Sequence, residues 1–348
     1  QQPLKSGVTP DWLKLPEHCS RNTQHATRLT VCVLTKNEEK FLAQCLASVK
    51  GIADQLLVLD TGSTDRTIEI AKSHGVEVHS FAWCDDFSAA RNAALEHITG
   101  DWVLMLDADE ELPADQHAKL RTDMADAGAI SYRLPLVNHG EEAQGRSFVP
   151  RFFRNAPGVY YYGRIHEQVF PSLLPLCKQF GLETKLGTAQ ITHHGYAKEV
   201  IKYRNKIERN LNLLQLAIAE RPQDANLQMN LGLELVRSGD LNAGIAHYRE
   251  AFRLMCALSP NEVVPELREV LLTQFTSHLY KLRAHDEVVN ALNSPLAKNG
   301  GLTASLHFAL GLAHYELNQP REAAEQMKQC VGKRNQPALS PINTRRPV

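Results

Sequence analysis

The feature of this sequence that most constrains its fold is a repeated order of short apolar run, polar loop and helical segment. Strand-like runs cover residues 29–34, 55–60 and 102–106. After the first two runs, a polar turn leads into apolar residues at helical spacing. This alternation predicts an α/β fold with a mostly parallel sheet, in which ligands bind at the carboxyl ends of the strands.

Further elements extend the predicted sheet. We expect helices over 67–74 and 87–98 and strands over 76–80 and 129–137, the last preceded by a helix after Pro113. Residues 138–196 are rich in Gly, His and aromatic side chains and are predicted as mixed strand and loop.

From about Glu199 onward the strand signals disappear and helical patterns replace them. Gly232 and Gly311 each lie in a similar apolar window, and each is followed seven residues later by a turn residue, Gly239 or Asn318. This is the tetratricopeptide (TPR) pattern, with residues 271–292 as a degenerate middle copy. A plain helical bundle that uses the same small-residue packing is the alternative.

Composition limits the class of protein. The 348 residues carry 38 Lys and Arg against 39 Asp and Glu, so the totals do not indicate a nucleic-acid partner. No apolar run reaches the ~18 residues of a membrane span, and the seven dispersed cysteines indicate reduced thiols. We expect a cytoplasmic protein divided into an N-terminal extension (1–28), an α/β domain (29–198), a TPR-like helical domain (199–335) and a C-terminal tail (336–348).

Carboxylates lie where the predicted strands end. Asp107 and Asp109 follow the third run, and two carboxylates at this spacing suit Mg²⁺ or Mn²⁺ bridging a diphosphate. Acidic residues after a strand are also common as solvated loop. Asp60 ends the neighbouring run and is predicted to bind ligand, whereas Asp65 is predicted to cap a helix. Thr35, Asn37 and Glu38 bring polar groups from the first run to the same crevice.

Four motifs in order carry a resemblance to a known family. They are Val33–Glu38, Val58–Asp65, Phe87–Asn92 and Gly100–Glu110. Together they resemble the nucleotide-sugar-binding half of inverting, family-two-type glycosyltransferases with the GT-A fold, over roughly residues 29–112. Beyond that half, three segments resemble the acceptor side of bacterial members that carry helical repeats: Arg151–Arg154, Gly163–Val169 and Ile191–Tyr196. Sublancin-type peptide S-glycosyltransferases share this two-part layout.

The resemblance implies roles for individual residues. Asp107 and Asp109 would hold the metal, Mn²⁺ or Mg²⁺, and His193 or His194 would add a metal or diphosphate contact. Adjacent histidines are also common as packed or solvated residues. The implied nucleotide-sugar site consists of Thr35, Asn37, Glu38, Asp60, Arg91, Asn92, Asp107, Ala108 and Asp109.

Inverting transfer needs a base that removes the acceptor's proton as the diphosphate leaves. Glu167 is the predicted catalytic base, with His166 second. The family commonly places its base on an acidic residue after the metal motif in the acceptor half, and this sequence has no clear acidic pair there. Glu167 could instead form a structural salt bridge with Arg151, Arg154 or Arg164.

The sequence therefore favours a metal-dependent hexosyltransferase that uses a nucleoside-diphosphate sugar, with UDP as the expected nucleotide. The acceptor would be a peptide or protein, or a surface glycan, and the helical domain would recruit it or form a homodimer. The alternative is a TPR-type interaction module attached to an inactive transferase domain. Nucleotidyl transfer would need a Gly-rich basic loop after the first strand, which Lys36 alone does not supply.

Overall fold

The structure is a computed structural model and describes residues 27–140, 147–194 and 200–333, with side chains of the last segment from residue 206. The chain divides into two compact units, Gln1–Lys198 and Glu199–Val348. Almost all of the predicted N-terminal extension (1–28), and the predicted tail (336–348), lie outside the described residues.

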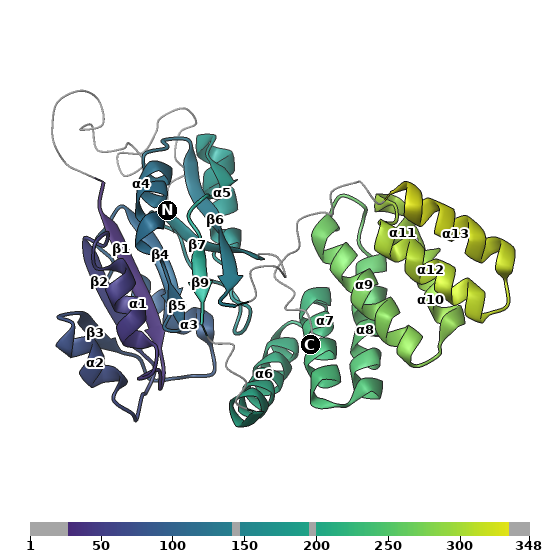
Figure 1. Ribbon diagram of the computed structural model, residues 1–348, viewed down its shortest axis with the longest axis horizontal. Coiled ribbons are helices and arrows are strands. Elements are labelled where there is room, and N and C mark those ends of the chain that lie inside the picture. Colours follow the sequence, from purple (N-terminus) through teal and green to yellow (C-terminus); the bar gives the residue numbers. More distant parts are fainter. Residues whose placement is uncertain (1–26, 141–146, 195–199, 334–348) are drawn as a thin grey trace. The chain divides into compact units, whose positions relative to one another are not determined.

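The first unit is built on a parallel half-sheet (Figure 1). Its strands lie in the order β3-β2-β1-β4. In register, Thr35 of β1 pairs with Asp60 of β2, and Leu34 pairs with Asp107 of β4. The predicted polar residues therefore leave the sheet at one edge. The bounds are β1 Leu29–Thr35, β2 Gln55–Asp60, β3 Glu77–Ser80 and β4 Trp102–Asp107.

An antiparallel half continues the sheet beyond β4. β7 pairs with β4 and β6 pairs with β7, both antiparallel, and β9 and β8 each add parallel to β6. The short β5 pairs with β9, which sets Glu110 opposite His193. Residues that follow β4 thus meet the end of β9. The bounds are β5 Glu110–Glu111, β6 Ala129–Asn138, β7 Ser147–Arg154, β8 Glu183–Leu186 and β9 Ile191–His193.

Helices cover both faces of the sheet because its strands are apolar on both sides. Leu104 and Leu106 face a core shared with α1 (Leu42–Val49), α2 (Thr67–Ser73) and α4 (His117–Met124). Val103 and Met105 face the opposite core, shared with α3 (Phe87–Leu95) and α5 (Phe170–Phe180). A short 3₁₀ turn, η2 (Ala114–Gln116), precedes α4. The predicted α/β architecture is confirmed.

Two details of this unit differ from the sequence prediction. The predicted helix 87–98 ends at Leu95, and residues 97 and 98 instead bond back to the carbonyls three residues earlier. Helix α5 lies inside the segment predicted as mixed strand and loop. Pro171 occupies its first turn, where a missing N–H costs nothing, and Gly181 ends the helix at a φ of 64°.

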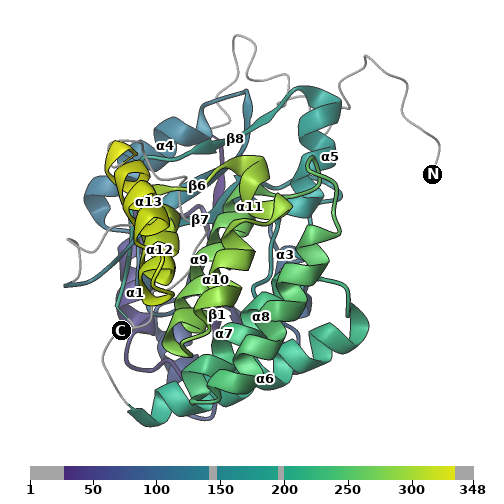
Figure 2. The ribbon, with the colours of Figure 1, turned by 90° about the vertical axis from the view of Figure 1, so that its right-hand side faces the viewer.

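The second unit is helical throughout its described residues (Figure 2). Three of its helical hairpins, α7–α8, α9–α10 and α12–α13, turn at a residue in the left-handed conformation: Gly239, Arg283 and Asn318. None of the described helices has a stretch long and apolar enough to cross a membrane. The bounds are α6 Val200–Glu220, α7 Ala225–Ser238, α8 Leu241–Cys256, α9 Pro265–Lys281, α10 His285–Leu292, α11 Pro295–Gly300, α12 Ala304–Glu316 and α13 Pro320–Gly332.

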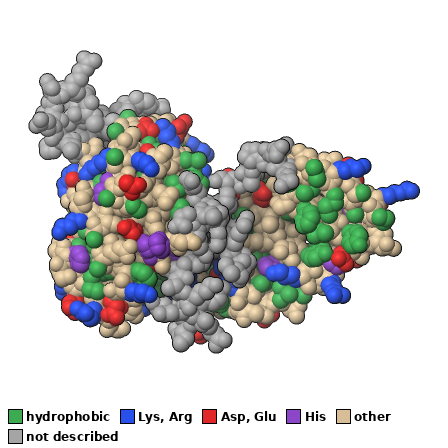
Figure 3. Space-filling model, in the orientation of Figure 1, with side chains coloured by type: hydrophobic (Ala, Val, Ile, Leu, Met, Phe, Trp, Pro, Cys, Tyr) green, Lys and Arg blue, Asp and Glu red, His purple; other side chains and the backbone are tan. Residues whose placement is uncertain are grey.

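The first and last of these hairpins close in the same way. A Cβ on Gly232 of α7 would lie 2.9 Å from the carbonyl of Gly244, and one on Gly311 of α12 would lie 2.9 Å from Met327. At Gly232 the close atom is backbone, so a small residue is needed where α7 and α8 cross, whereas at Gly311 it is the end of a flexible side chain. Hydrophobic side chains remain on the surface of the unit, where Figure 3 shows them in patches; Phe308 and Tyr315 are among the exposed ones.

Candidate active site

Asp107 lies between two arginines at the carboxyl end of β4. It continues the alternation that turns Val103 and Met105 toward α3. Arg91 of α3 donates from Nη2 to Asp107 Oδ1 at 3.1 Å, and Arg151 of β7 donates from Nη2 to Oδ2 at 2.6 Å. Burial opposes the charged form, but the two guanidinium groups outweigh it and hold the pKa of Asp107 below its usual value.

Arg151 also contacts Glu110, whose side chain is only 1% exposed. Glu110 Oε2 accepts a hydrogen bond from the backbone N–H of Asp107 at 2.9 Å, so it closes the turn after β4. Burial raises the pKa of Glu110 to about 7, against the opposing charge of Arg151. Arg151 therefore holds two carboxylates from the end of β4.

Arg91 carries the ionic contacts on to Glu167. Its Nε donates to Glu167 Oε1 at 2.6 Å, and the two side chains are 5% and 15% exposed. The Arg91 guanidinium also lies over the ring of Tyr161, 5.5 Å from its centroid. Its Nη1 is buried and has no hydrogen-bond partner in the described part of the chain. The salt bridge that the sequence left open for Glu167 is thus formed, with Arg91 rather than with Arg151, Arg154 or Arg164.

His166 precedes Glu167 in a closed loop. Tyr162 and Gln168 exchange backbone hydrogen bonds at 2.9 and 3.0 Å, which fastens the loop at its base. His166 is exposed and has a φ of 54°, a conformation that non-glycine residues seldom adopt. Backbone strain of this kind is often found at functional sites.

Asp109 and His193 come together where β4 and β9 end. His193 Nε2 lies 3.2 Å from Asp109 Oδ2, and its Nδ1 lies 3.2 Å from Asn138 Oδ1. Within the described part of the chain, no three His, Cys, Asp or Glu side chains are grouped closely enough to hold a metal. Mg²⁺ and Mn²⁺ at nucleotides, however, commonly take one or two protein ligands and complete their shell with phosphate and water. Asp109 and His193 fit such an ion, whereas both oxygens of Asp107 already have cationic partners.

His194 has different partners from His193. Its Nε2 lies 2.8 Å from Glu111 Oε2 and 3.3 Å from Gln44 Nε2, and its backbone N–H donates to the Asp109 carbonyl. The two predicted histidines therefore contact different carboxylates. The imidazole of His193 faces Asp109, and that of His194 faces Glu111.

The ends of β1 and β2 form the neighbouring part of the edge. Asp60 Oδ2 accepts from the backbone N–H groups of Gly62 and Ser63 at 2.9 and 3.0 Å. Asp60 Oδ1 and Thr35 Oγ1 are buried and have no hydrogen-bond partner among the described residues. Unpaired buried polar atoms are costly, so these two atoms are candidates for contact with a ligand.

Asn37 and Glu38 connect the loop after β1 to the loop after β2. Asn37 Oδ1 accepts from the backbone N–H of Thr64 at 2.7 Å, and the backbone N–H of Glu38 donates to Thr67 Oγ1 at 2.8 Å. Asp65 Oδ1 accepts from the backbone N–H of Thr67, the first residue of α2. The side chains of Asn37 and Asp65 are thus engaged within the protein.

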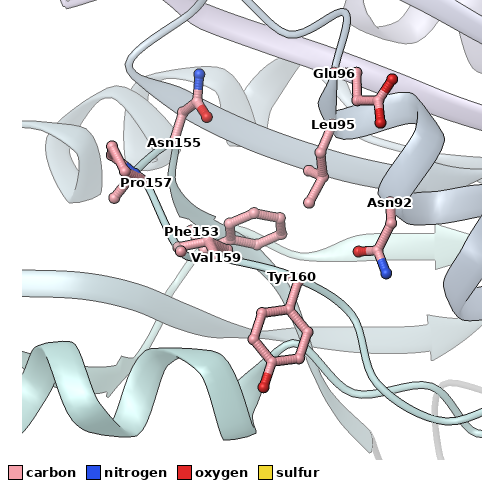
Figure 4. A pocket seen from close by; sticks show the side chains of 10 residues that line it. Asn92, Leu95, Glu96, Phe153, Asn155, Pro157, Val159 and Tyr160 are labelled. Carbon is pink, nitrogen blue, oxygen red and sulfur yellow. The ribbon is translucent and has the colours of Figure 1, made fainter. Parts of the chain in front are cut away.

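Asn92 and Ala108 lie apart from the unpaired polar atoms. Ala108 is buried in the core on the α1 side. Asn92 of α3 bonds the backbone of Tyr161 and lines a pocket of about 460 Å³ between α3 and residues 153–160 (Figure 4). Asn155 lines the same pocket and bonds the backbone just before β4, so the pocket extends toward the opposite end of β4 from Asp107.

Arg151 and Glu110 are the residues of this site that sequence reasoning missed. Glu110 follows the strand, where acidic residues are commonly solvated loop or a helix N-terminus, and nothing in the sequence indicates its burial. Arg151 is predicted only as part of the acceptor-side segment Arg151–Arg154 and as a possible salt-bridge partner of Glu167. The antiparallel pairing of Phe152 with Leu104 is what sets Arg151 beside the end of β4, and that long-range register has no local signal.

Comparison with known proteins matches part of this chain to a family model. Residues 30–170 match the model of glycosyl transferase family 2. A TPR repeat-containing protein of Synechococcus elongatus is 40% identical over 218 residues, 62% of this chain and 54% of that protein. The prophage-derived glycosyltransferase SunS of Bacillus subtilis is 28% identical over 211 residues, 60% of this chain and 49% of that protein. The chain thus spans about half the length of these curated relatives.

Among solved structures, residues 1–349 of S. aureus TarS in complex with UDP-GlcNAc are similar. That protein is 14% identical, with coverage of 88% of this chain and 92% of that chain, and the TM-score is 0.43. A likeness at this level supports no conclusion about the ligands of the present protein.

Proposed function

We propose that this chain, whose residues 30–170 belong to glycosyl transferase family 2, transfers a sugar from a nucleoside diphosphate to an acceptor. One observation carries the proposal: Asp60 at the end of β2, and Asp107 and Asp109 at the end of β4, lie at the same edge of the parallel half-sheet, on either side of β1, and His193 meets Asp109 there. Ligands of open α/β sheets bind at this edge.

The unpaired Oδ1 of Asp60 supports a uridine nucleotide. It is a buried acceptor whose partner oxygen is already held by two backbone N–H groups. The imide N–H of uracil is a donor that would satisfy it, whereas cytosine offers an acceptor at the same ring position. A carboxylate that stays unpaired rejects ligands lacking the complementary donor.

Asp109 and His193 would hold the divalent ion, Mn²⁺ or Mg²⁺. Bound there, the ion would stabilise the negative charge of the departing diphosphate. Asp107 would contribute indirectly, because it fixes Arg91 and Arg151 at the same edge. Fixed cationic groups beside a developing negative charge lower the barrier to its formation.

Glu167 is the proposed catalytic base of an inverting displacement. A bond forms between the acceptor atom and the anomeric carbon as the bond from that carbon to the diphosphate oxygen breaks, and Glu167 takes the acceptor's proton. Its contact with Arg91 fixes the carboxylate and leaves the second oxygen for this role. His166, exposed beside it, is the second candidate.

The acceptor is proposed to be a peptide or protein, or a glycan, recruited through the helical unit. Helical hairpins that stack in arrays usually bind peptides or pair with a second copy. The surface of the helical unit includes exposed apolar side chains such as Phe308 and Tyr315. These features support recruitment or homodimer formation equally.

A thermal-shift screen tests the proposed function. UDP-glucose, UDP-GlcNAc and the corresponding GDP sugars would be added with Mn²⁺ or Mg²⁺, and a ligand of the native state raises the unfolding temperature. We expect a shift with a UDP sugar and divalent metal, and its loss in Asp60→Ala. No shift with any donor would contradict the proposal and favour an interaction module with an inactive transferase domain.

A further inference from the structure

The loop that carries His166 and Glu167 is hydrogen-bonded to helix α3 and to the residues just before it. Tyr162 and Gln168 close it, and the backbone carbonyl of Arg164 accepts from the N–H of Phe87, the first residue of α3, at 2.9 Å. Arg164 Nη1 in turn donates to the carbonyl of Asp85, just before that helix, at 3.2 Å. The middle of the loop is thus bonded to the start of α3.

Asn92 holds Tyr161, the first residue of the loop. Its Nδ2 donates to the carbonyl of Tyr161 at 2.9 Å, and its Oδ1 accepts from the N–H of Tyr161 at 2.7 Å. Both hydrogen-bonding groups of one backbone residue are therefore satisfied by a single side chain. This amide pairs with the backbone as a neighbouring strand would, and only an asparagine of this orientation supplies both partners.

The neighbour of Asn92 holds the loop's catalytic candidate. Arg91 bonds Glu167 through Nε and lies over the Tyr161 ring. Two consecutive residues of α3 thus hold the loop. Asn92 bonds the backbone of Tyr161, and Arg91 bonds the side chain of Glu167. Arg91 also bonds Asp107, so the same helical turn connects the loop to the end of β4.

We propose that Asn92 is a positioning residue for the acceptor side of the reaction, acting through the loop 161–168, rather than a ligand of the nucleotide. This inference rests on the proposed function, in which Glu167 removes the acceptor's proton. Both polar groups of the Asn92 side chain are used by Tyr161, so neither needs a donor nucleotide as its partner.

A matched pair of variants tests the proposal, Asn92→Ala against Asn155→Ala. Asn155 also uses Nδ2 to hold the backbone, at Gly100, and lines the same pocket, but its hydrogen bonds go to residues 98–101. Hydrogen exchange followed by mass spectrometry would report the opening of residues 161–168, and UDP release from UDP-glucose with Mn²⁺ would report turnover.

In Asn92→Ala we expect faster exchange over 161–168 by about tenfold or more, since the N–H of Tyr161 loses its partner. We expect kcat to fall by about tenfold or more, because a misplaced catalytic group is costly. The donor KM should change by less than about twofold. Asn155→Ala should alter neither the exchange of this loop nor kcat.

Three results would overturn the inference. They are a raised donor KM at unchanged kcat, unchanged exchange over 161–168, and equal effects of the two variants. If Asn92→Ala does not fold, Arg164→Met removes the hydrogen bond from the loop to the Asp85 carbonyl and must lower kcat in the same way. Absence of UDP release by the wild-type protein would count against the proposed function, while the exchange measurement would still decide whether Asn92 holds the loop.

Discussion

Arg91 donates to Glu167 at 2.6 Å, and through a second nitrogen it donates to Asp107 at 3.1 Å. One buried guanidinium therefore joins the loop of the proposed base to the strand end of the proposed donor site. Arg151 extends the chain of charges from Asp107 to Glu110. A continuous set of ion pairs thus runs from Glu167 to Glu110, and each ion pair can be altered separately by substitution.

Replacing Glu167 by glutamine tests the proposed base. The amide keeps a hydrogen bond to Arg91 but cannot take a proton, so UDP release should fall by about 10²-fold or more. The thermal shift produced by a UDP sugar should persist, because Glu167 has no part in donor binding. His166→Ala is the matched variant, and a larger loss of turnover in His166→Ala than in Glu167→Gln would move the base to His166.

Replacing Arg151 by methionine tests its ion pairs with Asp107 and Glu110 at the end of β4. Glu110 would stay buried without its cation, and breaking a buried pair in this way costs about 3 kcal/mol of unfolding free energy. Arg66→Met removes a pair with Glu69 whose side chains are 70% and 65% exposed, and should lower the free energy of unfolding much less, because water screens the pair. Urea denaturation of both variants measures the difference, and equal costs would show that the Arg151 pair is not a buried one.

The crossing of α7 and α8 is tested by Gly232→Ala. The new methyl group would lie 2.9 Å from the Gly244 carbonyl and 3.0 Å from the Tyr248 ring, so the helices must separate. Such overpacking costs about 1–3 kcal/mol even though alanine favours helix. Gly332→Ala, where nothing lies within 4 Å, should be neutral or slightly stabilising. Thermal unfolding compares the two, and a neutral Gly232→Ala would contradict the close crossing.

Acid should weaken the helical unit through His278. Burial lowers the pKa of this imidazole to about 4, and its ring lies 5.3 Å from that of Tyr248. Because the unfolded chain takes up a proton near pH 6.5 and the folded one near 4, the stability from His278 is complete above pH 6.5. It is lost as the pH falls, by about 2 kcal/mol between pH 7.5 and 5.

The control for this effect is His278→Gln, which stays neutral at every pH. Denaturation of the wild type and of this variant at pH 7.5 and pH 5 should show a smaller loss of stability in the variant. The same loss in both proteins would remove His278 as its cause.

Local patterns predicted most of the elements that form the site. Asp60 and Asp107 could be placed at one edge because each ends an apolar run, and parallel strands end together. The turns at Gly239 and Asn318 were predicted from the repeat, and both residues have a positive φ.

The first and last hairpins also share a hydrogen bond between their two helices. Gln228 of α7 pairs with His247 of α8, and at the equivalent positions His307 of α12 pairs with Gln326 of α13.

What the sequence did not predict depends on contacts across long separations. The pairing of Arg91 with Glu167 follows from how the loop 161–168 lies against α3, and no spacing along the chain indicates it. Helix α5 lies within a segment that its Gly, His and aromatic residues predicted as mixed strand and loop. The division of the two histidines depends on the register of β9 with β5, which leaves His193 beside Asp109 and His194 beside Glu111.

Calorimetric titration of UDP, with and without Mn²⁺, tests the central claim most directly. The wild-type protein should bind UDP more tightly with Mn²⁺, and Asp109→Asn and His193→Ala should each weaken that binding by at least about tenfold. Asp115→Asn, in η2, should bind as the wild type does. Binding that is absent from the wild type, or that is unchanged in Asp109→Asn and His193→Ala, would contradict a metal-assisted nucleotide-sugar site at this edge of the sheet.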